Sequence, residues 1–155
     1  MIKLQFSTEN LLSSELIRTY DHGWCSHVDA VLPDDGSAIA NTLLGSRVSG
    51  GVQIRQPGYA KFSKTELVNL PTTNPIEEQF YVFLKGQVGK PYDSSAIEAF
   101  VFDRSWRKPD SWFCSELIAA ALEDSRFFPH KLSTPANRIT PADLLLTLSA
   151  YNLVE

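Results

Sequence analysis

The sequence predicts a single α+β domain covering residues 1–155, in which an antiparallel sheet or half-barrel of four to six strands packs against helices. Two observations predict this class. The first half of the chain contains short stretches of apolar or alternating residues separated by turn residues, which is typical of a meander of strands. The second half contains longer stretches with apolar residues at helical spacing and capping residues at their starts.

In the first half, one helix interrupts a series of strands. Ile2, Leu4 and Phe6 alternate with polar residues and predict the first strand. A helix is expected from 9 to 20, with an N-cap at Ser7 or Thr8 and with Gly23 in the left-handed position at its end. The remaining strands are expected at 24–32, 38–44, 52–55 and 66–70.

The second half predicts four helices. Asn74-Pro75-Ile76-Glu77 carries a cap residue, a proline and an acid, which start a helix that Gly89 ends. Thr140-Pro141-Ala142-Asp143 repeats this pattern before the last apolar stretch. Between them, helices are expected at 96–102 and from Cys114 or Ser115 to Asp124.

Composition excludes several classes of protein. The 155 residues, 43% hydrophobic and 21% charged, suit one globular domain. A net charge of −4 argues against a nucleic-acid surface, and no stretch reaches the roughly 18 apolar residues of a membrane span. The N-terminus alternates instead of resembling a signal peptide, so we expect a cytoplasmic protein with two reduced cysteines. Composition leaves the oligomeric state open.

Cys114 is the residue that most suggests chemistry, because it stands where an apolar segment becomes a strong helix former. The unpaired backbone N–H groups and the positive dipole end of a helix start both favour thiolate over thiol. The same N–H groups are placed to bind an oxyanion on a substrate carbonyl. The alternative is a small buried apolar residue with no chemical role.

A catalytic cysteine needs a base, and His27 is the histidine best placed to be one. It stands in a predicted strand, on the face shared by Cys25 and Asp29, whereas solvated positions are expected for His22 and His130. A half-buried structural role is the alternative for His27. His22, Cys25 and His27 have the spacing of metal ligands, but a fourth ligand is missing nearby, so neither a metal nor a cofactor is expected.

Four short motifs lie between Ser26 and Leu122, roughly two thirds of the chain. The motifs are Ser26-His27-Val28, Gly50-Gly51-Val52-Gln53-Ile54-Arg55, Gly89-Lys90-Pro91-Tyr92-Asp93 and Phe113-Cys114-Ser115-Glu116-Leu117. Together they resemble the circularly permuted branch of the NlpC/P60 superfamily, the YiiX/YebB-like papain-like cysteine hydrolases. Their order, with the histidine strand before the cysteine helix, is that of the permuted branch.

The resemblance implies a permuted papain-like fold and a hydrolase that works through an acyl-enzyme. Cys114 would be the nucleophile, His27 the general base, and Tyr92 a residue lining the substrate site, unless Tyr92 is a core tyrosine beside a turn. Glu116 is expected to be structural. The implied activity is that of an amidase or peptidase acting on a peptide or peptidoglycan fragment. The alternatives are a lipid acyltransferase or thioesterase with an acyl-lipid substrate, and a catalytically weak binding module.

The chain departs from this family at the residue that orients the histidine. Members usually carry His, Asn, Gln or Glu on the strand after the histidine strand, and the matching position here is Gly45, which has no side chain. Asn41, Ser46, Gln53 or a backbone carbonyl is left to take that role, and the sequence does not choose among them.

Overall fold

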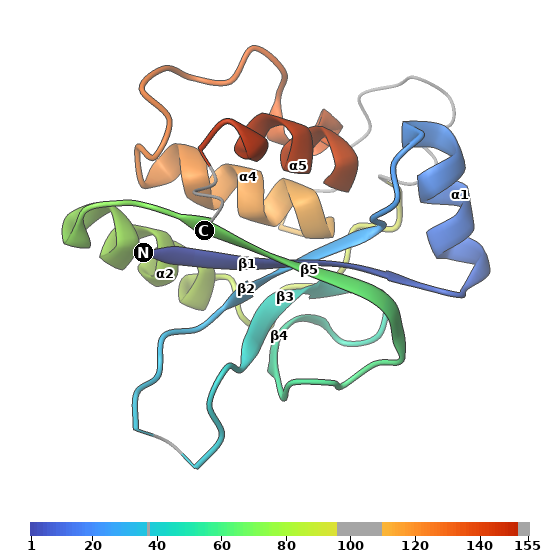
Figure 1. The fold of residues 1–155 in the computed structure, drawn as a ribbon, viewed down its shortest axis with the longest axis horizontal. Helices are drawn as coiled ribbons and strands as arrows, with labels where there is room; N and C mark the ends of the chain where they lie inside the picture. Colours follow the sequence, from blue (N-terminus) through green and yellow to red (C-terminus); the bar gives the residue numbers. More distant parts are fainter. Residues whose placement is uncertain (37, 96–109, 152–155) are drawn as a thin grey trace.

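Five antiparallel strands form a sheet in a computed structural model that describes residues 1–36, 38–95 and 110–151 (Figure 1). The α+β class is therefore confirmed. The strands follow the order β4-β3-β2-β1-β5 across the sheet. Their bounds are β1 (Ile2–Glu9), β2 (His27–Val31), β3 (Leu43–Arg47), β4 (Gly51–Arg55) and β5 (Phe62–Leu70).

The strand order is not that of a simple meander. β1 to β4 follow one another across the sheet as in the expected meander, but β5 pairs with β1 and not with β4, so that β1 lies between β2 and β5. Leu4 is opposite Ala30 on one side and Val68 on the other, and all three side chains are buried. The N-terminal strand is thus central to the sheet. Its apolar residues face the core beside those of β2 and β5.

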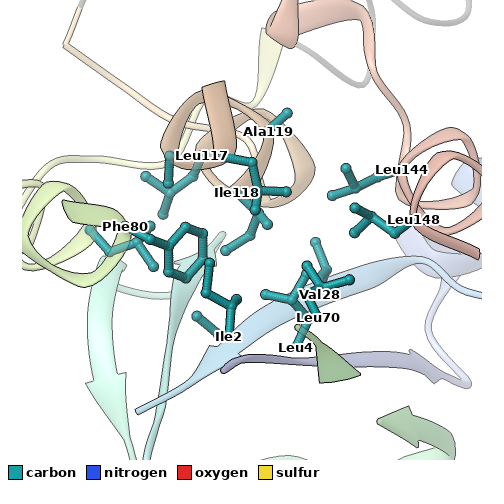
Figure 2. Close-up of a cluster of buried hydrophobic side chains, with 14 of the residues drawn as sticks. Ile2, Leu4, Val28, Leu70, Phe80, Leu117, Ile118, Ala119, Leu144 and Leu148 are labelled. Atoms are coloured by element: carbon teal, nitrogen blue, oxygen red, sulfur yellow. The ribbon is translucent and has the colours of Figure 1, made fainter. Parts of the chain in front are cut away.

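Helices cover one face of this sheet, with α4 and α5 lying over the strands (Figure 1). α4 packs against β2, β3, α2 and α5. Figure 2 shows its Leu117 and Ile118 in one cluster with Phe80 of α2, Leu144 of α5 and residues of the sheet. The bounds are α1 (Leu12–Asp21), α2 (Asn74–Gly86), α4 (Cys114–Asp124), the 3₁₀ helix η1 (Ala136–Arg138) and α5 (Pro141–Ser149).

The boundary between β1 and α1 differs from the sequence expectation. β1 continues to Glu9 because pairing with β5 extends to that residue, so Ser7 and Thr8 are strand residues and not caps. Leu11 is the N-cap of α1 and makes no side-chain capping bond. At the other end His22, with φ of 54°, takes the left-handed position that was expected for Gly23.

The later helices agree better with their capping signals. The Thr140 hydroxyl accepts a hydrogen bond from the Asp143 amide, and the Asp143 carboxylate accepts one from the Thr140 amide, as the pattern predicted. α2 has Thr73 as its N-cap, one residue before the expected Asn74. The helix expected at 96–102 lies outside the described residues.

Of the helices in the described ranges, none has the length and apolar character that crossing a membrane requires. The single-domain interpretation remains a prediction.

Candidate functional site

Cys114 is the first residue of α4, as the sequence predicted. Its side chain is 1% exposed and packs in a small apolar cluster with Phe113 and Ile17 of α1. The Sγ atom lies 4.0 Å from the carbonyl oxygen of Ser26, the residue before the histidine strand. The first backbone hydrogen bond of α4 runs from the Leu117 amide to the Phe113 carbonyl at 3.0 Å, so the amides of Cys114 and Ser115 precede it and have no acceptor within the helix.

His27 is the first residue of β2 and is brought to Cys114 by the packing of α4 against that strand. Its Nε2 atom lies 2.9 Å from Asp29 Oδ1, which leaves Nδ1 as the ring nitrogen for the thiol. Burial lowers the pKa of His27, but the charges of Asp29 and Cys114 and hydrogen bonds to both outweigh it and raise the pKa to about 9. The imidazole is therefore protonated at neutral pH.

Asp29 holds the histidine ring, two residues further along the same strand. Its carboxylate is 1% exposed, and its Oδ1 atom has no other partner among the described residues. Burial raises the pKa of Asp29, but the charge of His27 and hydrogen bonds from His27 and Tyr59 hold it below its usual value. The side chain is thus an anion that fixes the orientation of the imidazolium.

Gly45 provides the space that Asp29 occupies. A Cβ atom at Gly45 would lie 1.9 Å from Asp29 Oδ1 and 3.3 Å from the carbonyl oxygen of Val28. The carboxylate therefore fills the volume that a side chain on β3 would take. The alternatives considered from sequence do not reach this place: Ser46 donates to the carbonyl of Trp112, and Asn41 and Gln53 are exposed.

Tyr59 and Arg47 support the Asp29 carboxylate from its other side. The Tyr59 hydroxyl donates to Asp29 Oδ2 at 2.8 Å and lies 3.3 Å from His27 Nε2. Arg47 donates to the Tyr59 oxygen at 2.8 Å, and its guanidinium carbon lies 5.0 Å from the centre of the ring. Burial and the charge of Asp29 raise the pKa of Tyr59, so the hydroxyl stays neutral and remains a donor. A second nitrogen of Arg47 pairs with Glu9 at 2.7 Å.

Tyr92 lies beside the thiol because its segment pairs with the residues before α4. The Trp112 amide donates to the Pro91 carbonyl at 3.0 Å, and the Asp93 amide donates to the Trp112 carbonyl at 3.1 Å. The Tyr92 ring packs against the cluster that contains Cys114, with its centre 5.8 Å from that of Phe113. The structure thus places all three predicted site residues together.

Gly51 permits the approach of this segment to the sheet. It has φ of 66°, and a Cβ atom there would lie 2.2 Å from the Lys90 carbonyl oxygen. The neighbouring Val52 donates its amide to that oxygen at 2.9 Å and accepts from the Gly89 amide at 2.9 Å. The Gly50-Gly51 pair and the Gly89-Lys90-Pro91-Tyr92 motif therefore belong to one contact between β4 and the Tyr92 segment.

A cavity of about 220 Å³ opens onto the thiol and the imidazole. One wall is α1, and the others come from the ends of β1 and β3, the start of β2 and the segment around Tyr92. The lining residues are Glu9, Leu11, Ser14, Ile17, Ser26, His27, Arg47, Val48, Ser49, Tyr92 and Cys114. A larger cavity of about 970 Å³ lies along α4 towards Phe128, but its lining includes no cysteine, so the chemistry favours the smaller one.

The other residues singled out from sequence take ordinary positions. His22 and His130 are exposed, and Cys25 is buried and reduced. Glu116 is 1% exposed, and its carboxylate accepts a hydrogen bond from the Phe113 amide at 3.3 Å, which agrees with a structural role at the helix start.

Comparison with known proteins identifies a fold likeness. Among solved structures, the chain resembles one titled as the metalloprotein yiiX from Escherichia coli O157:H7, with a TM-score of 0.64 and 17% sequence identity. The match covers 82% of this chain and 66% of the length of that chain. No protein-family model matches the chain, and no curated protein matches it.

The described residues do not fit a metal in this fold. Across residues 1–36, 38–95 and 110–151, no three His, Cys, Asp or Glu side chains form a group that could hold an ion. In particular, His22 is exposed and Cys25 is buried in the main core, so the spacing that they share with His27 produces no site. We derive no step through a metal.

Proposed function

We propose that this protein is a cysteine-dependent hydrolase that cleaves an amide bond through an acyl-enzyme. The observation that carries the proposal is the His27 ring, held by Asp29 on one side and facing Cys114 at the start of α4 on the other. The order of the motifs, which resembles that of permuted NlpC/P60 proteins, supports it. The likeness to yiiX concerns the fold alone.

In the acylation step, the Cys114 thiolate attacks the substrate carbonyl carbon and forms a C–S bond. The negative charge that develops on the carbonyl oxygen is stabilised by backbone amides in the first turn of α4. The His27 imidazolium gives its proton to the leaving nitrogen as the C–N bond breaks. An amine departs, and the acyl group remains on the sulfur as a thioester.

In the deacylation step, the neutral His27 accepts a proton from water as the oxygen attacks the thioester carbonyl. The C–S bond then breaks, the carboxylic acid departs, and the thiolate–imidazolium pair is restored. Asp29 stabilises the imidazolium in both steps and keeps Nδ1 directed at the sulfur.

The cavity favours a polar substrate such as a peptide or a cell-wall peptide fragment. At about 220 Å³ it is narrow, and it is lined by three serines and by the charged pair Glu9 and Arg47. A long acyl chain requires an extended apolar tunnel, for which this cavity of about 220 Å³ is too small. A lipid acyltransferase or thioesterase is therefore the second candidate.

Thiol reactivity tests the proposal without knowledge of the substrate. In the native protein, Cys114 should react with iodoacetamide at pH 6, where an ordinary thiol with a pKa of about 8.5 is almost fully protonated. His27→Ala should slow this reaction roughly tenfold or more, because the thiolate loses its cationic partner. Peptide mass spectrometry reads Cys114 and the buried Cys25 separately, so Cys25 is the internal control.

Cys114→Ala should abolish hydrolysis of any amide or ester substrate while the far-ultraviolet circular dichroism stays that of the native protein. If Cys114 labels no faster than Cys25 before unfolding, the hydrolase proposal fails. The fold would then be one that serves in binding.

A further inference from the structure

The cavity beside Cys114 contains a buried carboxylate that acylation and deacylation do not use. Glu9 ends β1 and is 6% exposed, yet it is one of the lining residues of the cavity. Its Oε2 atom pairs with Arg47 Nη2 at 2.7 Å. Its Oε1 atom is buried and has no hydrogen-bond partner among the described residues.

An unpaired carboxylate oxygen is costly inside a protein, because burial removes the water that would otherwise bind it. The hydroxyl of Ser7, two positions earlier on the same strand, does not repair this loss, since its Oγ is itself buried without a partner among the residues that the structure describes. Arg47 does not repair it either, because its contacts are directed to Oε2 of Glu9 and to Tyr59. Glu9 therefore has an acceptor that the described part of the chain leaves without a partner, and its side chain lines the same cavity as Cys114.

We propose that Glu9 is the subsite for a cationic amine of the substrate, bound through Oε1. This inference rests on the proposed hydrolase function and specifies its substrate class: amides that carry a free ammonium group near the scissile carbonyl. An ammonium is the matching donor, because hydrogen bonds between two charged groups are about twice as strong as those between neutral groups. Arg47 holds the carboxylate in place from the opposite side.

Three thiol reagents that share one reactive group and differ in charge test the subsite. They are 2-aminoethyl, ethyl and 2-sulfonatoethyl methanethiosulfonate, which are cationic, neutral and anionic. In each case the Cys114 thiolate attacks the sulfenyl sulfur, a mixed disulfide forms and methanesulfinate leaves. Rates at Cys114, divided by the rates of the same reagents with the urea-unfolded chain, isolate the contribution of the site.

The cationic reagent should react preferentially with Cys114 in the native protein. Glu9→Gln should reduce the ratio of cationic to neutral rates roughly tenfold or more. The same variant should accelerate the anionic reagent, since Arg47 is left without its ion-pair partner. Glu15→Gln is the matched control, because Glu15 is an exposed acid on α1 outside this cavity and its loss changes net charge equally.

A measurement on the unmodified protein covers the case in which Glu9→Gln does not fold. Glycinamide, which carries an ammonium, should protect Cys114 from the neutral reagent, whereas N-acetylglycinamide at the same concentration should not. Equal protection by both compounds, or charge selectivity that survives Glu9→Gln, overturns the subsite. If instead Cys114 reacts with none of the three reagents in the native state, the hydrolase proposal itself fails.

Discussion

Asp29 orients the His27 ring from the same strand as the histidine. A residue on a neighbouring strand could also take this role. Side chains two apart on a strand point to the same face, so Asp29 follows His27 closely enough to bond its ring. Gly45 on the adjacent strand has no Cβ, and the carboxylate lies where that atom would be. Asp29 thus provides the carboxylate, and Gly45 leaves the volume that it fills. A carboxylate on either residue could in principle occupy this volume.

Exchanging the two residues tests this idea. Asp29→Gly should slow the labelling of Cys114 by iodoacetamide at pH 6 about tenfold, because the imidazolium loses its orienting anion. Gly45→Asp alone should destabilise the fold, since two carboxylates would compete for one volume. The double variant should recover much of the lost labelling rate. A double variant as slow as Asp29→Gly would show that the position on β2 is essential.

Asp29 also predicts how stability responds to acid. Its pKa in the folded protein is held below the usual value of 3.8. The stability that the ionised Asp29 side chain contributes is therefore fully present above about pH 3.8, and it is lost as the pH falls through the lower, folded-state pKa. The free energy of unfolding of the native protein should decrease from pH 5 to pH 2.5 more steeply than that of Asp29→Asn. Urea titrations at both pH values measure this, and parallel decreases would contradict it.

At the residue scale, the sequence reveals the site only in part. Cys114, His27 and Tyr92 were identified by short motifs, and the structure brings them together. Asp29 was within reach of the same reasoning, because its shared face with His27 follows from strand periodicity alone. Tyr59 and Arg47 were not, because Tyr59 in a loop and Arg47 at the end of β3 meet the site only through tertiary folding, on which periodicity does not report.

At the element scale, the success of prediction depends on how local the signal is. The starts of α4 and α5 were correctly placed because their caps are made by residues within one turn. The end of β1 was misplaced because pairing with β5, more than fifty positions later, keeps Thr8 and Glu9 in the sheet. The meander expected from sequence holds for β1 to β4, but the place of β5 beside β1 was missed, because long-range packing decides which strands become neighbours.

The contact between β4 and the Tyr92 segment predicts how a substitution at Gly51 changes stability and the reactivity of Cys114. Gly51→Ala should lower the free energy of unfolding by about 2 kcal/mol or more, because it adds a left-handed strain to a clash with the Lys90 carbonyl. The displaced segment should also change the labelling rate of Cys114, since Tyr92 packs beside the thiol.

Gly58→Ala is the matched control for this substitution. Gly58 has a similar φ of 70°, but nothing lies within 4 Å of the point where its Cβ atom would be. It should lose about 1 kcal/mol from backbone strain alone and leave the labelling rate unchanged. Equal losses in the two variants, measured by urea unfolding, would mean that the contact with Lys90 does not matter.

At the scale of the whole molecule, the site lies where the two halves of the chain meet. The sheet provides His27, Asp29 and the proposed amine subsite, and α4 provides Cys114. α1 lies at the end of the sheet far from α2 (Figure 1) and covers the cavity with Ile17. Cys114 is thus enclosed by several different parts of the chain, and under the proposed function this enclosure would select a small substrate group.

The distance along the chain between the two reactive partners has a consequence for biosynthesis. Ser26, beside His27, and Cys114 are 88 positions apart and meet where α4 packs on the sheet. Closing a loop of this length costs entropy before any stabilising contact forms, so we expect it to be a late step in folding. Until then Cys114 is without His27 beside it. Under the proposed function, the reactivity of Cys114 would then appear only in the folded molecule, and this delay would protect a nascent chain from premature modification of its own cysteine.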